Sequence, residues 1–161
     1  MITITPARQA DLPAILAIER AGFSEAEAGS PAAFRDRLAK LPDTFLVART
    51  DTGVAGFIVG PAVREEFVTD EMYDRTPRNL PTGGHQLVLS LAVAPDYQGR
   101  GIGSQLLAAL ATVARQAQRT TMSLDSLAAN VPFYERNGFQ KVNVSPSSHA
   151  GETWYRLVKQ L

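Results

Sequence analysis

The segment that most constrains this chain is a glycine-rich turn between an apolar run and a helical pattern. The turn, Gln98-Gly99-Arg100-Gly101-Ile102-Gly103, follows the strand-like run 86–94 and opens the helical spacing of 102–117. The first N–H groups of a helix lack intrahelical partners and carry partial positive charge, and glycines let a ligand approach the backbone. The turn therefore predicts a pyrophosphate site, with Gln98 and Arg100 as further donors.

Two other phosphate-binding patterns do not fit this turn. It lacks the Gly-Lys-Ser/Thr ending of a nucleotide-triphosphate loop. Its spacing and its position in the middle of the chain also differ from the dinucleotide fingerprint, which lies near a first strand. A glycine pattern alone also fits a tight strand-to-helix turn that binds no ligand, so that interpretation stays open at this point.

Strands and helices alternate in the middle of the chain, and strands pair near both ends. The patterns predict strands at 1–5, 45–50, 54–60, 86–94, 120–125, 139–144 and 153–158. They predict helices at 11–22, from Ser30-Pro31 through Leu38, at 102–117 and at 129–137. Residues 61–84 have no clean periodicity and predict a long loop or a short helix, often a functional feature. We therefore expect one α/β (α+β) domain over residues 1–161 with a mixed sheet.

Composition narrows the function classes. The chain has no cysteine, which excludes disulfides, zinc–thiolate sites and a catalytic thiol, and we expect no metal. Its net charge is zero with scattered Lys and Arg, so no nucleic-acid partner is expected. No apolar run reaches the roughly 20 residues of a membrane span. The start lacks signal-peptide features, so we expect a cytoplasmic protein with no membrane partner.

Two motifs, in order, resemble those of the GCN5-related N-acetyltransferase (GNAT) superfamily. The stretch Leu91–Leu107 resembles its coenzyme A motif, which is a strand, then Gln/Arg-x-x-Gly-x-Gly/Ala, then a helix. Ala129–Phe139 resembles its second motif, at the expected distance. The resemblance spans nearly the whole chain. It implies acetyl-CoA as cofactor and a mixed, mostly antiparallel sheet of about seven strands, with a central parallel pair split in a V and about four flanking helices.

The resemblance also implies a coenzyme site built from the strand, the glycine turn and the second motif. Its members are Leu91, Ala92, Val93, Gln98, Gly99, Arg100, Gly101, Ile102, Gly103, Ser104, Asn130, Phe133 and Tyr134. By the same resemblance the backbone of Leu91 and Val93 bonds the pantetheine arm, and Tyr134 is the general acid that protonates the leaving thiolate. Taken alone, Tyr134 fits equally well as a tyrosine packed on a helix face.

Within the superfamily the chain resembles the arylalkylamine (serotonin-type) N-acetyltransferases most. The similar stretches are Gly56–Gly60 with the acids that follow, Ala21–Pro31, and Val131–Tyr134. Animal members place two histidines on the strand before the coenzyme motif, where this chain has Leu87 and Leu89. That histidine relay is therefore absent. His85, Glu65 and Glu66 are the candidate bases, with water alone as an alternative, and each also fits as an ordinary surface residue.

The acceptor pocket is the least determined part of the sequence. Phe23, Phe57 and Tyr73 are candidates for an aromatic slot that binds an aryl or alkyl amine, although Phe23 and Phe57 fit equally as core. The acids of residues 65–74 fit a polyamine. We predict an N-acetyltransferase for a small primary amine, as a monomer or homodimer. The alternatives are a protein or peptide N-acetyltransferase and a catalytically weak CoA-binding domain.

Overall fold

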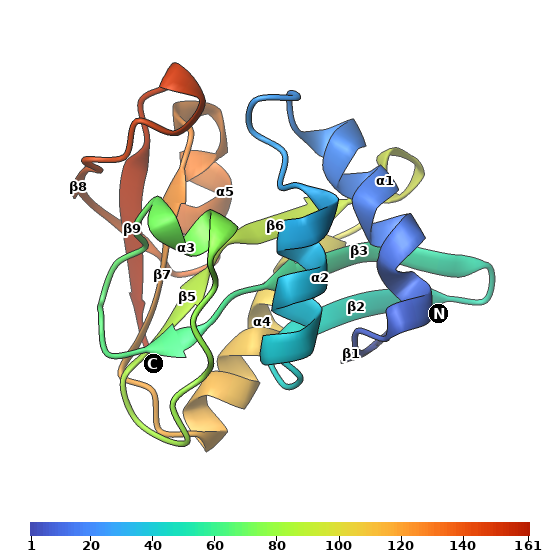
Figure 1. The fold of residues 1–161 in the computed structure, drawn as a ribbon, viewed down its shortest axis with the longest axis horizontal. Helices are drawn as coiled ribbons and strands as arrows, with labels where there is room; N and C mark the ends of the chain where they lie inside the picture. Colours follow the sequence, from blue (N-terminus) through green and yellow to red (C-terminus); the bar gives the residue numbers. More distant parts are fainter.

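A computed structural model describes all residues, 1–161, and contains two β-sheets that diverge from each other (Figure 1). The first sheet has four strands, all antiparallel, in the order β1-β2-β3-β6. Their bounds are Thr3–Pro6 for β1, Phe45–Thr50 for β2, Gly53–Val59 for β3 and Ser90–Val93 for β6.

The second sheet has five strands in the order β4-β5-β7-β9-β8, and only β5 and β7 are parallel. Their bounds are Ala62–Val63 for β4, His85–Val88 for β5, Thr121–Ser126 for β7, Gln140–Val144 for β8 and Tyr155–Gln160 for β9. The expected mixed fold with one central parallel pair is confirmed.

The two sheets part at Leu89, inside the run that the sequence predicts as one strand over 86–94. Up to Val88 the chain pairs with β7, whereas from Ser90 it pairs with β3. Close backbone contact accompanies this change, because a Cβ on Gly60 would lie 1.8 Å from the carbonyl oxygen of Leu87. Only glycine fits there. The expected strand is therefore two strands, β5 and β6, and the V opens between β6 and β7.

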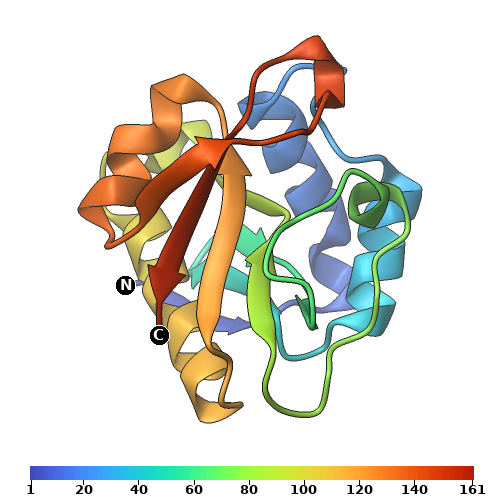
Figure 2. The ribbon, with the colours of Figure 1, turned by 90° about the vertical axis from the view of Figure 1, so that its left-hand side faces the viewer.

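Helices cover the first sheet on both faces (Figures 1 and 2). The structure has five α-helices: α1 at Leu12–Gly22, α2 at Pro31–Lys40, α3 at Glu71–Asp74, α4 at Ile102–Gln116 and α5 at Val131–Arg136. Helices α1 and α2 lie on one face and α4 on the other, while α5 packs against β8 and β9. The helix beyond the expected four is α3, within the segment 61–84.

Strand periodicity explains this layering. In β2, Phe45 and Val47 point into the core beneath α1 and α2, whereas Leu46 and Ala48 point into the core beneath α4. Successive side chains of a strand alternate between faces, so a strand that is apolar throughout must be covered on both sides. None of the helices has the length and apolar character that a membrane crossing requires.

Candidate functional site

A cavity of about 250 Å³ lies where the two sheets separate. Its walls come from the β5–β6 junction, the end of β7, the start of α5, the C-terminal part of α1, the segment between α1 and α2, and the region of α3. The volume falls below the roughly 300–1,000 Å³ of pockets for drug-sized ligands. The V therefore encloses space for a small molecule between its arms.

A buried carboxylate, Glu19, lines the cavity from α1. The side chain is 3% exposed. Its oxygens accept hydrogen bonds from the Ser90 hydroxyl at 2.6 Å and from the Gly29 amide at 2.8 Å. Burial raises the pKa of Glu19, against the two hydrogen bonds, which lower it. A carboxylate with a raised pKa beside a cavity is suited to accept a proton near neutral pH.

A buried guanidinium, Arg37, lines the same cavity from α2. Its Nη2 donates to the carbonyl oxygen of Tyr73 at 2.8 Å, and the guanidinium lies over the Phe34 ring at 4.6 Å. Burial lowers the pKa of Arg37, and the negative charge of Glu19 opposes that change. The cavity thus holds a buried positive group as well as a buried negative one.

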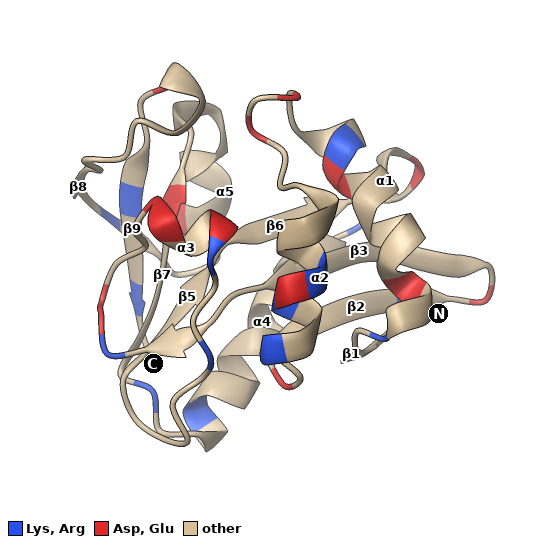
Figure 3. Ribbon diagram, in the orientation of Figure 1, with Lys and Arg blue, Asp and Glu red and all other residues tan.

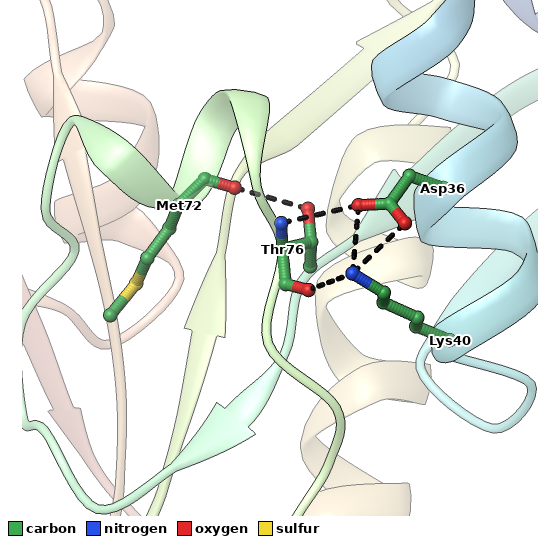
Figure 4. A network of polar contacts seen from close by, with 4 residues as sticks. All are labelled: Asp36, Lys40, Met72 and Thr76. Atoms are coloured by element: carbon green, nitrogen blue, oxygen red, sulfur yellow. Dashed lines mark hydrogen bonds and ion pairs between the residues drawn. The ribbon is translucent and has the colours of Figure 1, made fainter.

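A polar network fixes α3 against α2 next to this arginine (Figure 4). Lys40 pairs with Asp36 at 3.0 Å and donates to the carbonyl oxygen of Thr76 at 3.0 Å. The Thr76 amide donates to Asp36 at 3.3 Å, and its hydroxyl donates to the carbonyl oxygen of Met72 at 3.0 Å. These bonds hold the segment that carries Tyr73, so this wall is fixed by the fold.

Two loops from opposite arms of the V meet over the cavity. His149, between β8 and β9, stacks on Tyr73 with ring centroids 5.1 Å apart. Its Nε2 lies 3.1 Å from the carbonyl oxygen of Glu27, between α1 and α2. Trp154 Nε1 donates to the carbonyl oxygen of His149 at 2.8 Å. We call Glu27, His149 and Trp154 the roof, because all three line the cavity at its aromatic end.

Acidic residues line the cavity from both arms of the V. Figure 3 colours red the ribbon positions of acidic residues on α1, α3 and β7. On β7, Asp125 accepts from the Ser145 hydroxyl at 2.7 Å through one oxygen, and its other oxygen is buried without a partner. Burial raises the pKa of Asp125. Arg156, the cross-strand neighbour of Asp125 on β9, supplies a positive charge that opposes this rise.

The phenol of Tyr134 faces the cavity from α5. Its ring packs edge-on against Phe133 and Phe139, with centroids 5.1 and 5.7 Å away. Burial raises the pKa of Tyr134, so the phenol stays protonated at neutral pH. Its hydroxyl has no hydrogen-bond partner within the protein and is free to donate to a molecule in the cavity.

The glycine turn lies at the start of α4 with its backbone open. Gly99 and Gly101 have φ of 77° and 79°, and a Cβ at either would meet no atom within 4 Å. The first amide to bond back into α4 is that of Gln105, to the carbonyl oxygen of Gly101 at 3.1 Å. The amides of Ile102, Gly103 and Ser104 precede it, so they are the free donors of a helix start. This cradle fits a pyrophosphate.

The other residues expected at the coenzyme surround this turn or line the cavity. Gly103 lies under Phe133, because a Cβ on Gly103 would come within 3.1 Å of that ring. Arg100 is exposed and lies over the Tyr97 ring at 5.1 Å. Leu91 and Asn130 line the cavity. The side chain of Ala92 instead points into the core beneath α1, so only its backbone is near the site.

The strand β6 offers unpaired backbone to the V. The amide of Ala94 bonds to the carbonyl oxygen of Ala55 at 2.7 Å. Because antiparallel pairing alternates, the amides of Leu91 and Val93 point away from β3 and towards the gap. The carbonyl oxygen of Val93 accepts from Gln98 Nε2 at 3.2 Å, which ties the strand to the glycine turn.

Four of the six residues singled out as candidate bases or acceptor-pocket walls do not line the cavity. Glu65 and Glu66 are exposed in the segment between β4 and α3. His85 Nδ1 lies 2.7 Å from the Thr121 hydroxyl, at the far end of β5 from the split. Phe57 is wholly buried and packs edge-on against Phe34 at 5.6 Å. By contrast, Phe23 and Tyr73 do line the cavity, as expected.

Sequence reasoning missed Glu19 and Arg37, although each left a signal. Glu19 falls on the apolar stripe of α1, four residues after Ile15. Arg37 falls on the buried face of α2, three residues after Phe34. A charge placed on the buried stripe of a helix is costly unless it has a role, so both positions stood out from their pattern.

The sequence matches a known family. A family model described as an acetyltransferase (GNAT) domain matches residues 42–141, which include the split, the glycine turn and α5. No curated protein matches the chain in a direct search.

Solved structures with the same fold cover nearly the whole chain. Ard1 from Thermoplasma volcanium is 21% identical with a TM-score of 0.78, over 99% of this chain and 97% of that one. The ribosomal-protein-S18-alanine N-acetyltransferase from Escherichia coli is 22% identical with a TM-score of 0.70, over 99% and 94%. The loading GNATL domain of CurA from Lyngbya majuscula is 13% identical with a TM-score of 0.83, over 99% and 98%. At these identities the likeness concerns the fold.

Proposed function

This chain belongs to the acetyltransferase (GNAT) family, and from that premise we propose that it transfers the acetyl group of acetyl-CoA to a small primary amine held in the cavity between β6 and β7. The family makes it an acetyl-CoA-dependent N-acetyltransferase. The observation that carries the proposal about the acceptor is Glu19, a buried carboxylate that lines a small roofed cavity at the split of the V.

Glu19 is the proton acceptor of the proposed reaction. An ammonium has no free electron pair and must lose a proton before its nitrogen attacks. Glu19 takes that proton, directly or through one water, because burial raises the pKa of its carboxyl above the ordinary glutamate value. The Ser90 hydroxyl, 2.6 Å away, orients the carboxylate. Glu19 replaces His85, Glu65 and Glu66 in this role, since none of those three lines the cavity.

Tyr134 is the proton donor. When bound, acetyl-CoA supplies an activated thioester and a sulfur leaving group. Tyr134 Oη donates to that sulfur, and its raised pKa keeps the phenol protonated through neutral pH.

The coenzyme is held by backbone groups. The amides from Ile102 to Ser104 hold its pyrophosphate at the start of α4, with Arg100 at the edge of the turn. The amides of Leu91 and Val93 hold its pantetheine arm, and Asn130 and Phe133 border it on the α5 side.

The size and walls of the cavity favour a small acceptor over a peptide. If the terminal amine of a peptide lay in the cavity, the rest of the peptide would have to extend out past the roof, where Glu27 and His149 are in contact. The aromatic walls, Phe23, Tyr73 and Trp154, suit the aryl or alkyl amine that the arylalkylamine resemblance suggests. Asp125 with its unpartnered oxygen suits the second charge of a polyamine. A small organic amine is thus the proposed acceptor.

The experiment is release of CoA from acetyl-CoA with arylalkylamines, polyamines, amino acids and short peptides, with the acetylated product identified by mass spectrometry. Turnover of small amines, with peptides at least tenfold poorer in kcat/KM, is the expected result. Preference for peptides would move the acceptor outside the roofed cavity and overturn the proposal. If no acceptor of the panel is turned over while acetyl-CoA still binds, a CoA-binding domain without this activity is favoured.

A further inference from the structure

Arg37 is a buried cation with far fewer partners than it has donors. A guanidinium has five N–H donors, and the structure records one hydrogen bond, from Nη2 to the carbonyl oxygen of Tyr73. Nε is buried without a partner. The residue is 1% exposed, so water does not replace the missing acceptors freely. Such a group is costly unless something in the cavity accepts its hydrogen bonds.

Glu19 is beside Arg37 but not in contact with it. The Gly29 amide donates to Glu19, and a Cβ on Gly29 would lie 3.3 Å from Arg37 Nη1. Both side chains therefore lie next to Gly29. Their charged atoms are farther apart than an ion pair, since the structure has ion pairs only at Lys40–Asp36 and Arg49–Asp11. A carboxylate and a guanidinium thus border one cavity side by side.

The proposed reaction removes one of the negative charges that act on Arg37. Glu19 becomes neutral when it takes the proton of the acceptor ammonium, which leaves Asp74, a lining residue of the cavity, and Asp36, which pairs with Lys40, as the acids near Arg37. A simple amine offers no acceptor to the donors of Arg37 that have no partner. An acceptor that carries its own carboxylate next to the amine keeps Arg37 paired throughout, through two parallel charge-assisted hydrogen bonds.

We propose that the acceptor is an α-amino acid, with its amine at Glu19 and Ser90, its carboxylate on Arg37, and its side chain towards the aromatic walls Tyr73 and Trp154. This inference rests on the proposed function and narrows it, since an α-amino acid is a small primary amine. The adjacent opposite charges of the acceptor match the adjacent opposite charges across Gly29. The cavity of about 250 Å³ suits a molecule of this size.

The first test compares matched acceptors on the unmodified enzyme. Each amino acid that is turned over is measured beside its decarboxylated amine and its carboxamide, for example tryptophan, tryptamine and tryptophanamide, or lysine and cadaverine. We expect kcat/KM for the acid to exceed both partners by at least tenfold. Equal or better turnover of the amine or the amide overturns this inference and leaves amine acetylation standing. No turnover of any member overturns both.

The second test replaces Arg37 with glutamine, and Arg35→Gln on the exposed side of the same helix is the matched control. We expect Arg37→Gln to raise KM for the amino acid by at least tenfold and to leave KM for the decarboxylated amine within about twofold. Arg35→Gln changes neither. A loss that is equal for acid and amine contradicts carboxylate binding by Arg37. The comparison of acceptors on the unmodified enzyme decides the matter if Arg37→Gln does not fold.

Discussion

The two sides of the V are built on different principles. On the coenzyme side the proposed pyrophosphate site is one contiguous stretch, Gln98 to Ser104, and its candidate binding groups are backbone amides that lie exposed at a helix start. The acceptor side draws buried side chains from distant segments, Glu19 from α1, Arg37 from α2 and Asp125 from β7. Backbone amides need only the right turn, whereas buried charges need several packed elements to hold and balance them.

The specificity for the acceptor therefore depends on the cavity and not on the glycine turn. An open cradle of amides binds a pyrophosphate whatever the rest of the ligand is. A small cavity lined by buried carboxylates and one buried guanidinium selects by the arrangement of charge. We therefore expect the affinity for acetyl-CoA to depend on substitutions that change the backbone of the turn. Turnover of the acceptor is expected to depend on substitutions that remove single polar atoms.

The largest expected effect comes from the coenzyme side. Gly101→Glu places a side chain where φ is 79° and a carboxylate where the phosphates bind. Loss of two charge-assisted hydrogen bonds, at about 1.5–3 kcal/mol each, weakens acetyl-CoA binding by roughly 10²-fold or more. Gly83→Glu is the matched control, since Gly83 has φ of 75° and equally open space away from the site. Titration with acetyl-CoA measures both variants, and equal affinities would remove the turn from the site.

A smaller effect is expected at the junction of the two sides. Tyr134→Phe removes the proposed proton donor and keeps the ring packed between Phe133 and Phe139, so turnover falls by roughly 10²-fold. The affinity for acetyl-CoA stays within about twofold of the unmodified enzyme. Tyr155→Phe, on β9 and outside the cavity, serves as control. A turnover within twofold of the unmodified enzyme would exclude the Tyr134 phenol as acid.

The smallest effect is expected from one hydroxyl on the acceptor side. Ser90→Ala removes the 2.6 Å hydrogen bond that stabilises the ionised form of Glu19, so the pKa of Glu19 rises further. At neutral pH kcat/KM falls only a few-fold, and the pH at which activity is half lost on acidification moves upwards. A profile that stays in place, or moves to lower pH, would show that Ser90 does not act on the titrating group.

The two sides also differ in what the sequence could predict. The glycine turn is local, and its spacing between a strand and a helix was sufficient to place it. The split sheet was expected from the family resemblance. The sequence suggested one strand over 86–94, because no local signal at Leu89 marks the exchange of partners from β7 to β3. That exchange depends on long-range pairing.

The buried charged residues of the acceptor side could not be predicted from the sequence for a related reason. Acids at 65–66 were plausible from their position in a long segment, but the fold leaves them exposed, and it buries Phe57 in the core. Glu19 is 71 positions from its partner Ser90, so no short motif joins them. The informative signal was a charge on an apolar helix stripe, which periodicity alone can flag but cannot assign to a cavity.

In the proposed mechanism Glu19 accepts the proton of the amine. Glu19→Gln is a fair test of it, because glutamine can still accept from Gly29 and donate to Ser90. The raised pKa of Glu19 means that its ionisation costs stability as pH rises above the ordinary glutamate value. The variant is therefore expected to be at least as resistant to thermal unfolding at neutral pH, and to bind acetyl-CoA normally.

The most direct measurement is the pH dependence of kcat/KM for the best acceptor, in the unmodified enzyme and in Glu19→Gln. In the unmodified enzyme activity falls on acidification through an apparent pKa above the ordinary glutamate range, since the carboxylate must be ionised to act. Glu19→Gln is slower by roughly 10²- to 10⁴-fold and lacks that acidic limb. A variant that keeps the same limb, or a near-normal rate, would contradict the account.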